Sequence, residues 1–360
     1  MKICLIGQNI TNLILALMLS EKKLAVDIYQ NNNKPGPKSD RTIAISNENF
    51  KYLKDLIKIH IPSWPTNEIK IFLEKKNSKE IINFKKKRKE TFNLISYSKL
   101  TNICFSQIKK SRYIKTNKID KTDSSFIKKI EKYNLVINCD KKNSISKKYF
   151  YNKLKKNYKS YAYTFIINHK KLINNTASQI FTKFGPLAFL PIGNSKTSIV
   201  FSCSGILKDN EQIINLFKNY NNFYDVKKIN KIEKFPLIFY TQRNYIYKNI
   251  LAFGDLIHTI HPLAGQGLNM TIRDIKILSK IIDKKNNLGL PVDISVGEEF
   301  QKKTKHLNYL YGKAIDAIYE FFKLDSKLNN SMSEPIFNVL NKNSLFKKYS
   351  NLFSEKGFNL

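Results

Sequence analysis

The stretch that decides the fold is residues 250–274, which read ILAFGDLIHTIHPLAGQGLNMTIRD. Its apolar run, Ile250–Phe253, predicts a short buried strand that ends at Gly254 and Asp255. A loop with one proline and two glycines follows. From Leu268 onward, apolar side chains recur at helical spacing, which predicts an amphipathic helix. The stretch is therefore expected to form a strand, a loop and a helix in succession.

The loop has features of a ligand site. A carboxylate at the carboxyl end of a strand, here Asp255, suits the hydroxyl groups of a sugar chain. Gly265 and Gly267 let the backbone approach a flat or anionic ligand closely, and the start of the next helix offers free N–H groups. An ordinary connection whose glycines only shape the turn has the same spacing. Spacing alone leaves both interpretations open.

The identity of the residues favours the ligand site. Together they resemble the second flavin motif of the FAD-dependent aromatic hydroxylases, whose fold is that of para-hydroxybenzoate hydroxylase. The matching positions are Gly254, Asp255, His258, Pro262, Gly265, Gln266, Gly267, Leu268, Asn269 and Asp274. Within that family, the surrounding His-Thr-Ile-His-Pro and Arg-Asp are most similar to the ubiquinone-biosynthesis hydroxylases.

The amino-terminal residues predict the other end of a dinucleotide site. A strand, a helix and a second strand are expected at residues 2–7, 13–19 and 25–29, which is the beginning of a βαβ unit. Gly7 is in place, but Asn9 and Asn12 occupy the second and third glycine positions of G-x-G-x-x-G. Gln30 replaces the acidic residue that ends the second strand. Asn tolerates left-handed backbone and Gln can bind a hydroxyl, but neither restores the close approach that glycine allows.

Two further segments resemble the same family. Arg41, in the run RTIAIS, is similar to an arginine that lies near the flavin, so the resemblance implies contact with the cofactor. A surface arginine before a strand or helix is the alternative. Residues 135–140 predict a buried strand that ends in Asp140 and resembles the third family motif, with Asn138 and Lys141 in place of two glycines. Asp140 is equally compatible with a helix cap or a turn.

The predicted fold class is α/β. We expect a Rossmann-like FAD-binding domain with a mixed βαβ sheet, interleaved with a smaller antiparallel-sheet substrate domain and followed by a helical C-terminal region. Successive strands without helices between them, over residues 161–202, indicate the antiparallel sheet. The expected FAD-binding parts are 1–66, 93–158 and 246–295, the substrate-domain parts are the hairpin 67–92 and residues 159–245, and the helical region is 296–360.

The composition limits the partners and the compartment. The formal charge of +35 comes from lysines spread along the chain, without a nucleic-acid-binding motif. We therefore expect no nucleic-acid partner, although the charge suits anionic lipid head groups. Four cysteines without a C-x-x-C pair argue against a zinc site or a disulfide framework and for a reducing cytoplasm, and no metal site is expected. Without a signal peptide or an apolar run of roughly 20 residues, the expected location is the cytoplasm, or the inner face of the cytoplasmic membrane.

The resemblance implies a FAD-dependent monooxygenase that hydroxylates the aromatic ring of a polyprenylated phenol in ubiquinone biosynthesis. In such enzymes NAD(P)H reduces FAD, and O2 then forms a hydroperoxyflavin that transfers oxygen to the ring. FAD would be bound by Gly7, Asn9, Asn12, Gln30, Arg41, Gly254, Asp255, Pro262, Gly265, Gln266, Gly267, Leu268 and Asn269. Since the cofactor carries the chemistry, no catalytic side chain is expected. His258 and His261 are candidates for acid–base work or for stabilising the loop.

Three candidate functions stay open at this point, and the active hydroxylase described above is the first. Erosion of two glycine motifs is compatible with a non-catalytic or weakly FAD-loaded subunit of a ubiquinone-biosynthesis assembly, and the charge leaves a nucleic-acid-binding protein as a third candidate. A nicotinamide dehydrogenase is disfavoured, because no catalytic histidine, serine or Tyr–Lys pair stands out beside the βαβ unit. The ring position, the choice between NADH and NADPH and the oligomeric state do not follow from the sequence.

Overall fold

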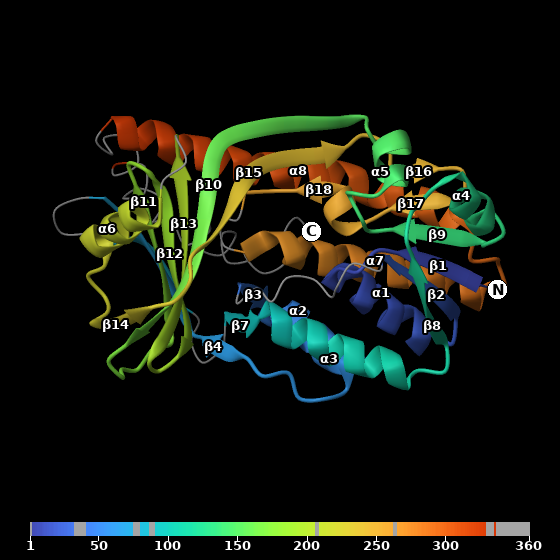
Figure 1. Cartoon of the computed structure of the whole chain (residues 1–360), viewed down its shortest axis with the longest axis horizontal. Helices are drawn as coiled ribbons and strands as arrows, with labels where there is room; N and C mark the ends of the chain where they lie inside the picture. The colour runs from blue at the N-terminus through green and yellow to red at the C-terminus, as the bar shows by residue number, and fades with distance from the viewer. Residues whose placement is uncertain are drawn as a thin grey trace.

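Two large sheets stand at opposite ends of the molecule, with helices packed between and along them (Figure 1). The computed structural model describes residues 2–31, 41–74, 80–85, 91–205, 209–261, 265–328 and 335. One sheet has six strands, the other has nine, and a small sheet of three strands lies between them.

The six-stranded sheet has the order β16-β17-β9-β1-β2-β8. Its strands are β1 (Lys2–Ile6), β2 (Ala25–Asn31), β8 (Ile114–Ile119), β9 (Leu135–Asn138), β16 (Ile246–Tyr247) and β17 (Ile250–Ala252). All neighbours are parallel except β16 and β17. The carboxyl ends of parallel strands share one edge of a sheet. Residues 7, 140 and 254, which lie far apart in the chain, therefore meet at that edge.

Helix α1 (Ile10–Glu21) is a core helix. Residues Ile10 to Leu19 are all buried, because the helix packs against α2, α3 and α7 as well as the sheet. A helix that is apolar all round needs such surroundings. The other helices on this half are α2 (Asn47–Ile57), α3 (Tyr97–Lys110), α4 (Ser124–Ile130), α5 (Ser144–Tyr149) and α7 (Gln266–Asn287).

The nine-stranded sheet has the order β18-β15-β10-β13-β12-β11-β5-β6, and β14 also pairs with β10. Its strands are β5 (Glu68–Leu73), β6 (Glu80–Lys85), β10 (Lys153–His169), β11 (Thr176–Thr182), β12 (Gly185–Gly193), β13 (Lys196–Ser204), β14 (Val226–Ile229), β15 (Glu233–Gln242) and β18 (His258–Thr259). Every pair is antiparallel except β11 with β5. Helix α6 (Asn210–Tyr220) covers one face through Ile213 and Phe217.

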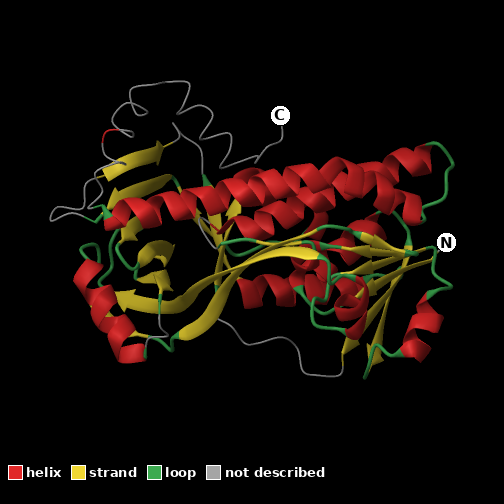
Figure 2. Ribbon diagram, turned by 90° about the horizontal axis from the view of Figure 1, so that it is seen from above, coloured by secondary structure: helices red, strands yellow, loops and turns green. Residues whose placement is uncertain are grey.

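Helix α8 (Ile294–Lys327) joins the two halves. It runs along the length of the molecule from one large sheet to the other (Figure 2). Tyr311, Tyr319 and Phe322 of this helix pack on residues of the nine-stranded sheet, and Phe300 packs into the core of the other half. Within the described residues, every helix is too short or too polar to cross a membrane.

The small sheet has the order β3-β7-β4, formed by β3 (Thr42–Ser46), β7 (Phe92–Ser96) and β4 (Trp64–Thr66). The predicted α/β fold class, with an interleaved antiparallel sheet and a helical C-terminal region, is confirmed by the likeness to solved structures that is reported below. The sequence pattern does not reveal β8, because its polar, partly exposed residues lack a buried face. The six segment boundaries stay a prediction.

Candidate functional site

A cavity of about 380 Å³ lies between the carboxyl edge of the six-stranded sheet and the open face of the nine-stranded sheet. This volume is within the range of small-molecule sites, roughly 300–1,000 Å³. Six of the thirteen residues expected to bind a cofactor line the cavity: Asn9, Arg41, Asp255, Gly265, Gly267 and Leu268. The structure thus gathers three separate sequence segments around one space.

Asp255 reaches the cavity from a tight turn after β17. Gly254 begins the short 3-10 helix η1 (Gly254–Leu256) with a φ of +60°, and a Cβ there would lie 2.7 Å from the Cγ2 of Thr11. Only glycine fits this position. The turn leaves the Asp255 side chain exposed at the cavity while its backbone carbonyl oxygen accepts a hydrogen bond from the Tyr240 hydroxyl.

The loop that leads into α7 presents backbone to the cavity. Gly265 has a φ of +63° and lies against β3, where an added Cβ would be 3.1 Å from the Cβ of Ala44. Gly267 is in the first turn of α7, and apart from its chain neighbours and the helix backbone no atom of a described residue lies within 4 Å of the position of its missing Cβ. A flat ligand can therefore approach this backbone closely. Pro262, also expected to contact the cofactor, lies outside the described residues.

Two residues of the expected cofactor set face away from the cavity. Asn269 accepts a hydrogen bond from the Ser46 backbone N–H at 2.9 Å and donates one to the carbonyl of Ala44 at 2.9 Å. It fastens β3 to the start of α7. The side-chain oxygen of Gln266 accepts a hydrogen bond from the Tyr311 hydroxyl of α8 at 2.7 Å. Both side chains support the loop rather than line the cavity.

Arg41 lies at the cavity, just before β3. Its guanidinium group is 4.8 Å from the centre of the Tyr97 ring, a distance typical of a cation–π contact. Tyr97 and Lys141 line the same region. Tyr97 belongs to no sequence motif, and its place at the cavity is therefore not predictable from the local pattern.

The amino-terminal turn is built from asparagines. Gly7 has a φ of +124°, which requires glycine. The Asn9 side chain caps α1 by accepting a hydrogen bond from the Asn12 N–H at 3.0 Å, and its amide donates to the carbonyl of Cys139 at 2.8 Å. Asn12 is fully buried, and its amide donates to the carbonyl of Gly7. The asparagines thus satisfy the backbone of the turn.

Two buried atoms of this region lack a partner among the described residues. They are the Oδ1 of Asn12 and the Nε2 of Gln30, whose residues are 0% and 6% exposed. An unsatisfied buried polar atom is costly unless a ligand or water completes it. Gln30 stands at the end of β2, where a ribose hydroxyl would accept its hydrogen bond. This orphan donor, the open space at Gly267 and the exposed Asp255 fit the ribose, ring and ribityl parts of FAD.

His258 lines the cavity and leads into a buried polar network. One ring nitrogen of His258 lies 3.0 Å from a carboxylate oxygen of Asp274, which also pairs with Arg273 at 2.9 Å and with the Asn308 amide of α8. Burial alone would raise the pKa of Asp274, but the Arg273 charge and the His258 contact outweigh it, so the pKa lies below its usual value. The network anchors the loop to α8.

His261 is buried between two tyrosine rings. It stacks on Tyr319 with the ring centres 4.2 Å apart and meets Tyr158 edge-on at 5.3 Å. Neither ring nitrogen has a hydrogen-bond partner among the described residues. Burial lowers the pKa of His261 to about 3, although Asp316 opposes this effect. His261 is therefore neutral at physiological pH, and of the two histidines only His258 borders the cavity.

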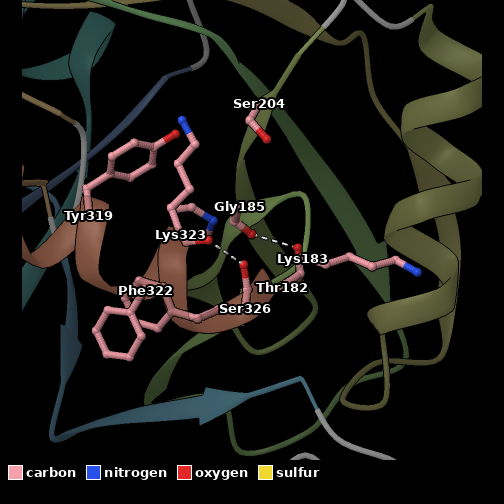
Figure 3. A pocket seen from close by; sticks show the side chains of 10 residues that line it. Thr182, Lys183, Gly185, Ser204, Tyr319, Phe322, Lys323 and Ser326 are labelled. Atoms are coloured by element: carbon pink, nitrogen blue, oxygen red, sulfur yellow. Dashed lines mark hydrogen bonds between the residues drawn. The ribbon is translucent and has the colours of Figure 1, made fainter. Parts of the chain in front are cut away.

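A second hollow near the end of α8 is far smaller, about 10 Å³, which is room for roughly one water molecule. Figure 3 shows its polar side chains, which include Thr182, Lys183 and Ser326. Thr182 and Ser326 donate hydrogen bonds to the backbone carbonyls of Gly185 and Lys323. Within the described part of the chain, no cluster of three His, Cys, Asp or Glu side chains could hold a metal ion. The larger cavity is the candidate site.

A family model described as squalene epoxidase matches residues 132–350. This segment covers more than half of the chain and contains the 250–274 stretch. The chain belongs to the squalene epoxidase family. Among curated proteins it is 25% identical over 190 residues to the mitochondrial ubiquinone biosynthesis monooxygenase COQ6 of Dictyostelium discoideum, covering 42% of this chain and 38% of the relative. The resemblance to ubiquinone-biosynthesis hydroxylases is thereby confirmed.

A second relative is the 3-demethoxyubiquinol 3-hydroxylase of Escherichia coli (strain K12), 28% identical over 158 residues, covering 40% of this chain and 39% of the relative. The chain thus spans less than half the length of these curated relatives. Among solved structures, p-nitrophenol 4-monooxygenase PnpA of Pseudomonas putida DLL-E4 superposes with a TM-score of 0.79 over 99% of this chain and 98% of that protein, at 10% identity.

The pqsL protein of Pseudomonas aeruginosa, described as a probable FAD-dependent monooxygenase, superposes with a TM-score of 0.69 at 13% identity and covers 92% of this chain and 99% of that protein. At such identities the likeness shows the fold. Together with the cavity, it places this family member among proteins with the fold of flavin monooxygenases. The individual cofactor contacts remain predictions.

Proposed function

We propose that the protein is a FAD-dependent monooxygenase that hydroxylates the aromatic ring of a polyprenylated phenol in ubiquinone biosynthesis, with NAD(P)H and O2 as co-substrates. One observation carries the proposal. Asp255, the Gly265–Gly267 backbone and the amino terminus of α1 border a single cavity whose opposite wall is an antiparallel sheet. The names of the relatives support the reaction and the substrate class.

The residues of this chain would bind and orient the reactants. The Asp255 carboxylate accepts hydrogen bonds from ribityl hydroxyls, and the backbone at Gly265 and Gly267 holds the flat ring. The α1 terminus offers N–H groups and a positive dipole to the pyrophosphate. When bound, FAD supplies the transfer of one oxygen atom from O2 to the ring. The apolar wall, which includes Leu190 and Leu237, excludes water.

Titration of the purified protein with FAD tests this proposal. We expect saturable binding with a flavin absorbance spectrum, and loss of binding in Asp255→Ala. The matched control is Asp225→Ala, since Asp225 is 60% exposed in a surface pair with Lys170. Absence of FAD binding by the native chain would overturn the proposal and favour a non-catalytic subunit. Full FAD occupancy in Asp255→Ala would mean that this motif is only a turn.

We also propose that the protein works at the inner face of the cytoplasmic membrane, where a polyprenylated substrate resides. Helix α8 exposes Leu310, Ile318 and Leu324, and Leu328 follows its last residue; these large apolar side chains are between 41% and 54% exposed. The net charge of +35 would attract anionic head groups. Salt-sensitive sedimentation with phosphatidylglycerol vesicles, and not with phosphatidylcholine vesicles, is the expected result. Recovery of equal amounts of the protein in the supernatant with both kinds of vesicle would contradict the proposed membrane location.

A further inference from the structure

A row of paired residues crosses the wall of the cavity that the nine-stranded sheet forms. Thr164 of β10 pairs with Val200 of β13, Val200 pairs with Ala188 of β12, and Ala188 pairs with Gln179 of β11. All four residues line the cavity. Residues paired across strands lie on the same face of a sheet. Thr164 and Gln179 are therefore the polar ends of a row whose centre is apolar.

The other side chains of the sheet determine on which face this row lies. The neighbouring residues Tyr163, Ile180, Phe189 and Phe201 point to the other face, where they form a buried cluster with α6. Successive side chains of a strand alternate between faces. Turning Gln179 away from the cavity would require a shift in register that exposes this cluster. The amide therefore stays at the wall.

This part of the wall carries no charge. On β10 to β13, the described residues that line the cavity are Ala162, Thr164, Ala177, Ser178, Gln179, Ala188, Leu190 and Val200. The charged lining residues Arg41, Lys141 and Asp255 all lie on the opposite side, before β3 and at the edge of the six-stranded sheet. The Gln179 amide makes no hydrogen bond to another described residue and is only partly buried. It offers both a donor and an acceptor to a ligand.

We propose that Gln179 positions the ring of the substrate by hydrogen bonding to an uncharged oxygen substituent. This assignment rests on the proposed function and names the chemistry that the site selects. A hydroxyl or ether oxygen can pair with the amide. A carboxylate against this wall would lose its hydration without gaining a cation, which is costly. Rings that carry a carboxylate should therefore bind poorly.

Two probes of similar shape test the proposal: 4-methylphenol, which is neutral, and 4-hydroxybenzoate, which is anionic. Isothermal titration calorimetry of the FAD-saturated full chain should give at least tenfold tighter binding of 4-methylphenol. Gln179→Leu keeps the size of the side chain and should weaken 4-methylphenol binding about tenfold, the value of one good hydrogen bond. Gln179→Lys adds a cation at the wall and should reverse the preference between the two probes.

The control is Gln107→Leu, the same substitution on α3, away from the cavity; the Nε2 of Gln107 is buried without a described partner, so leucine is tolerated there. Ala188→Phe fills the centre of the row and should abolish binding of both probes, which locates the site. Unchanged 4-methylphenol binding in Gln179→Leu, tighter binding of 4-hydroxybenzoate by the native chain, or no binding of either probe would overturn the proposal. FAD titration of the same samples reports separately on the proposed function.

Discussion

The side-chain amide of Asn9 donates a hydrogen bond to the backbone carbonyl of Cys139 over 2.8 Å. This bond ties the turn after β1 to the turn after β9. Both turns lack glycines that the family motifs contain, and the missing glycine at position 9 is replaced by the residue that makes the tie. The turn after β1 thus gains a cross-link to the turn after β9 at the position where it loses space for a close ligand approach.

Asn9→Ser separates the two roles of Asn9. Serine is a good helix N-cap but is too short to donate to Cys139. We expect a loss of about 1 kcal/mol in the free energy of unfolding from the missing hydrogen bond. Asn9→Ala removes the cap as well and should cost about 1 kcal/mol more. Urea unfolding measures both values. Equal stability of Asn9→Ser and the native chain would mean that the cross-link contributes nothing.

Gly267→Ala should separate stability from binding. Alanine favours the helix by up to about 1 kcal/mol over glycine, and in the described part of the chain the added Cβ meets no atom within 4 Å outside its own helix backbone and chain neighbours. The variant should be as stable as the native chain or more so, yet bind FAD more weakly, because its methyl group enters the cavity. Thermal unfolding and FAD titration give the two quantities. Unchanged FAD affinity would place the flavin away from Gly267.

Gly254→Ala is the contrasting control for Gly267→Ala. Its φ of +60° and the Thr11 Cγ2 atom 2.7 Å from the added Cβ both oppose alanine. The left-handed backbone alone costs about 1–2 kcal/mol, so this variant should lose stability. A stable Gly254→Ala protein would contradict the geometry of the turn.

Asp274→Asn should destabilise the protein by about 3–5 kcal/mol at neutral pH, because Arg273 is left buried without its carboxylate partner. The pKa of Asp274 is lowered in the folded state. Its contribution is therefore present above the unfolded pKa of about 4 and is lost as the pH falls through the folded pKa. Urea unfolding should show the gap to the native chain narrowing in acid. Asp225→Asn, in an exposed pair, is the control.

His261→Phe should make the protein more resistant to mild acid. The pKa of His261 is lowered to about 3 by burial, so the unfolded chain binds the proton first. The contribution of neutral His261 to the free energy of unfolding is thus fully present above the unfolded pKa of about 6.5. It falls by about 2 kcal/mol between pH 8 and pH 5. Phenylalanine keeps the stacking on Tyr319 and removes this loss. Melting temperatures at both pH values measure it, with His60→Phe, at an exposed position, as the control. If His261→Phe and the native chain lost the same amount of stability between pH 8 and pH 5, the lowered pKa of His261 would be contradicted.

The local patterns of the sequence predict much of the chain correctly. The apolar runs at 2–7, 135–140 and 250–253 are buried strands, because a strand covered on both faces needs such runs. The motif residues Asp255, Gly265 and Gly267 lie at the cavity. Strand β8 and the first half of β10 were not predicted, because polar residues such as Asn117 and Lys156 occupy partly buried positions and hide the apolar alternation. These segments are strands because they pair with neighbouring strands, and their own residue pattern does not indicate it.

The sequence by itself determined the first strand and the helix of residues 250–274 and their likeness to a flavin motif, because glycine and apolar periodicity act locally. The predicted loop between them contains the short strand β18, which forms by pairing with β15. Only the tertiary structure decided what each motif residue contacts. Asn269 and Gln266 belong to the motif, yet they bond to β3 and α8 rather than face the cavity. Gln179, an unmarked strand residue, reaches the cavity because sheet register places it there. Contacts between residues far apart in the chain depend on how whole elements pack, and that packing is absent from any local pattern.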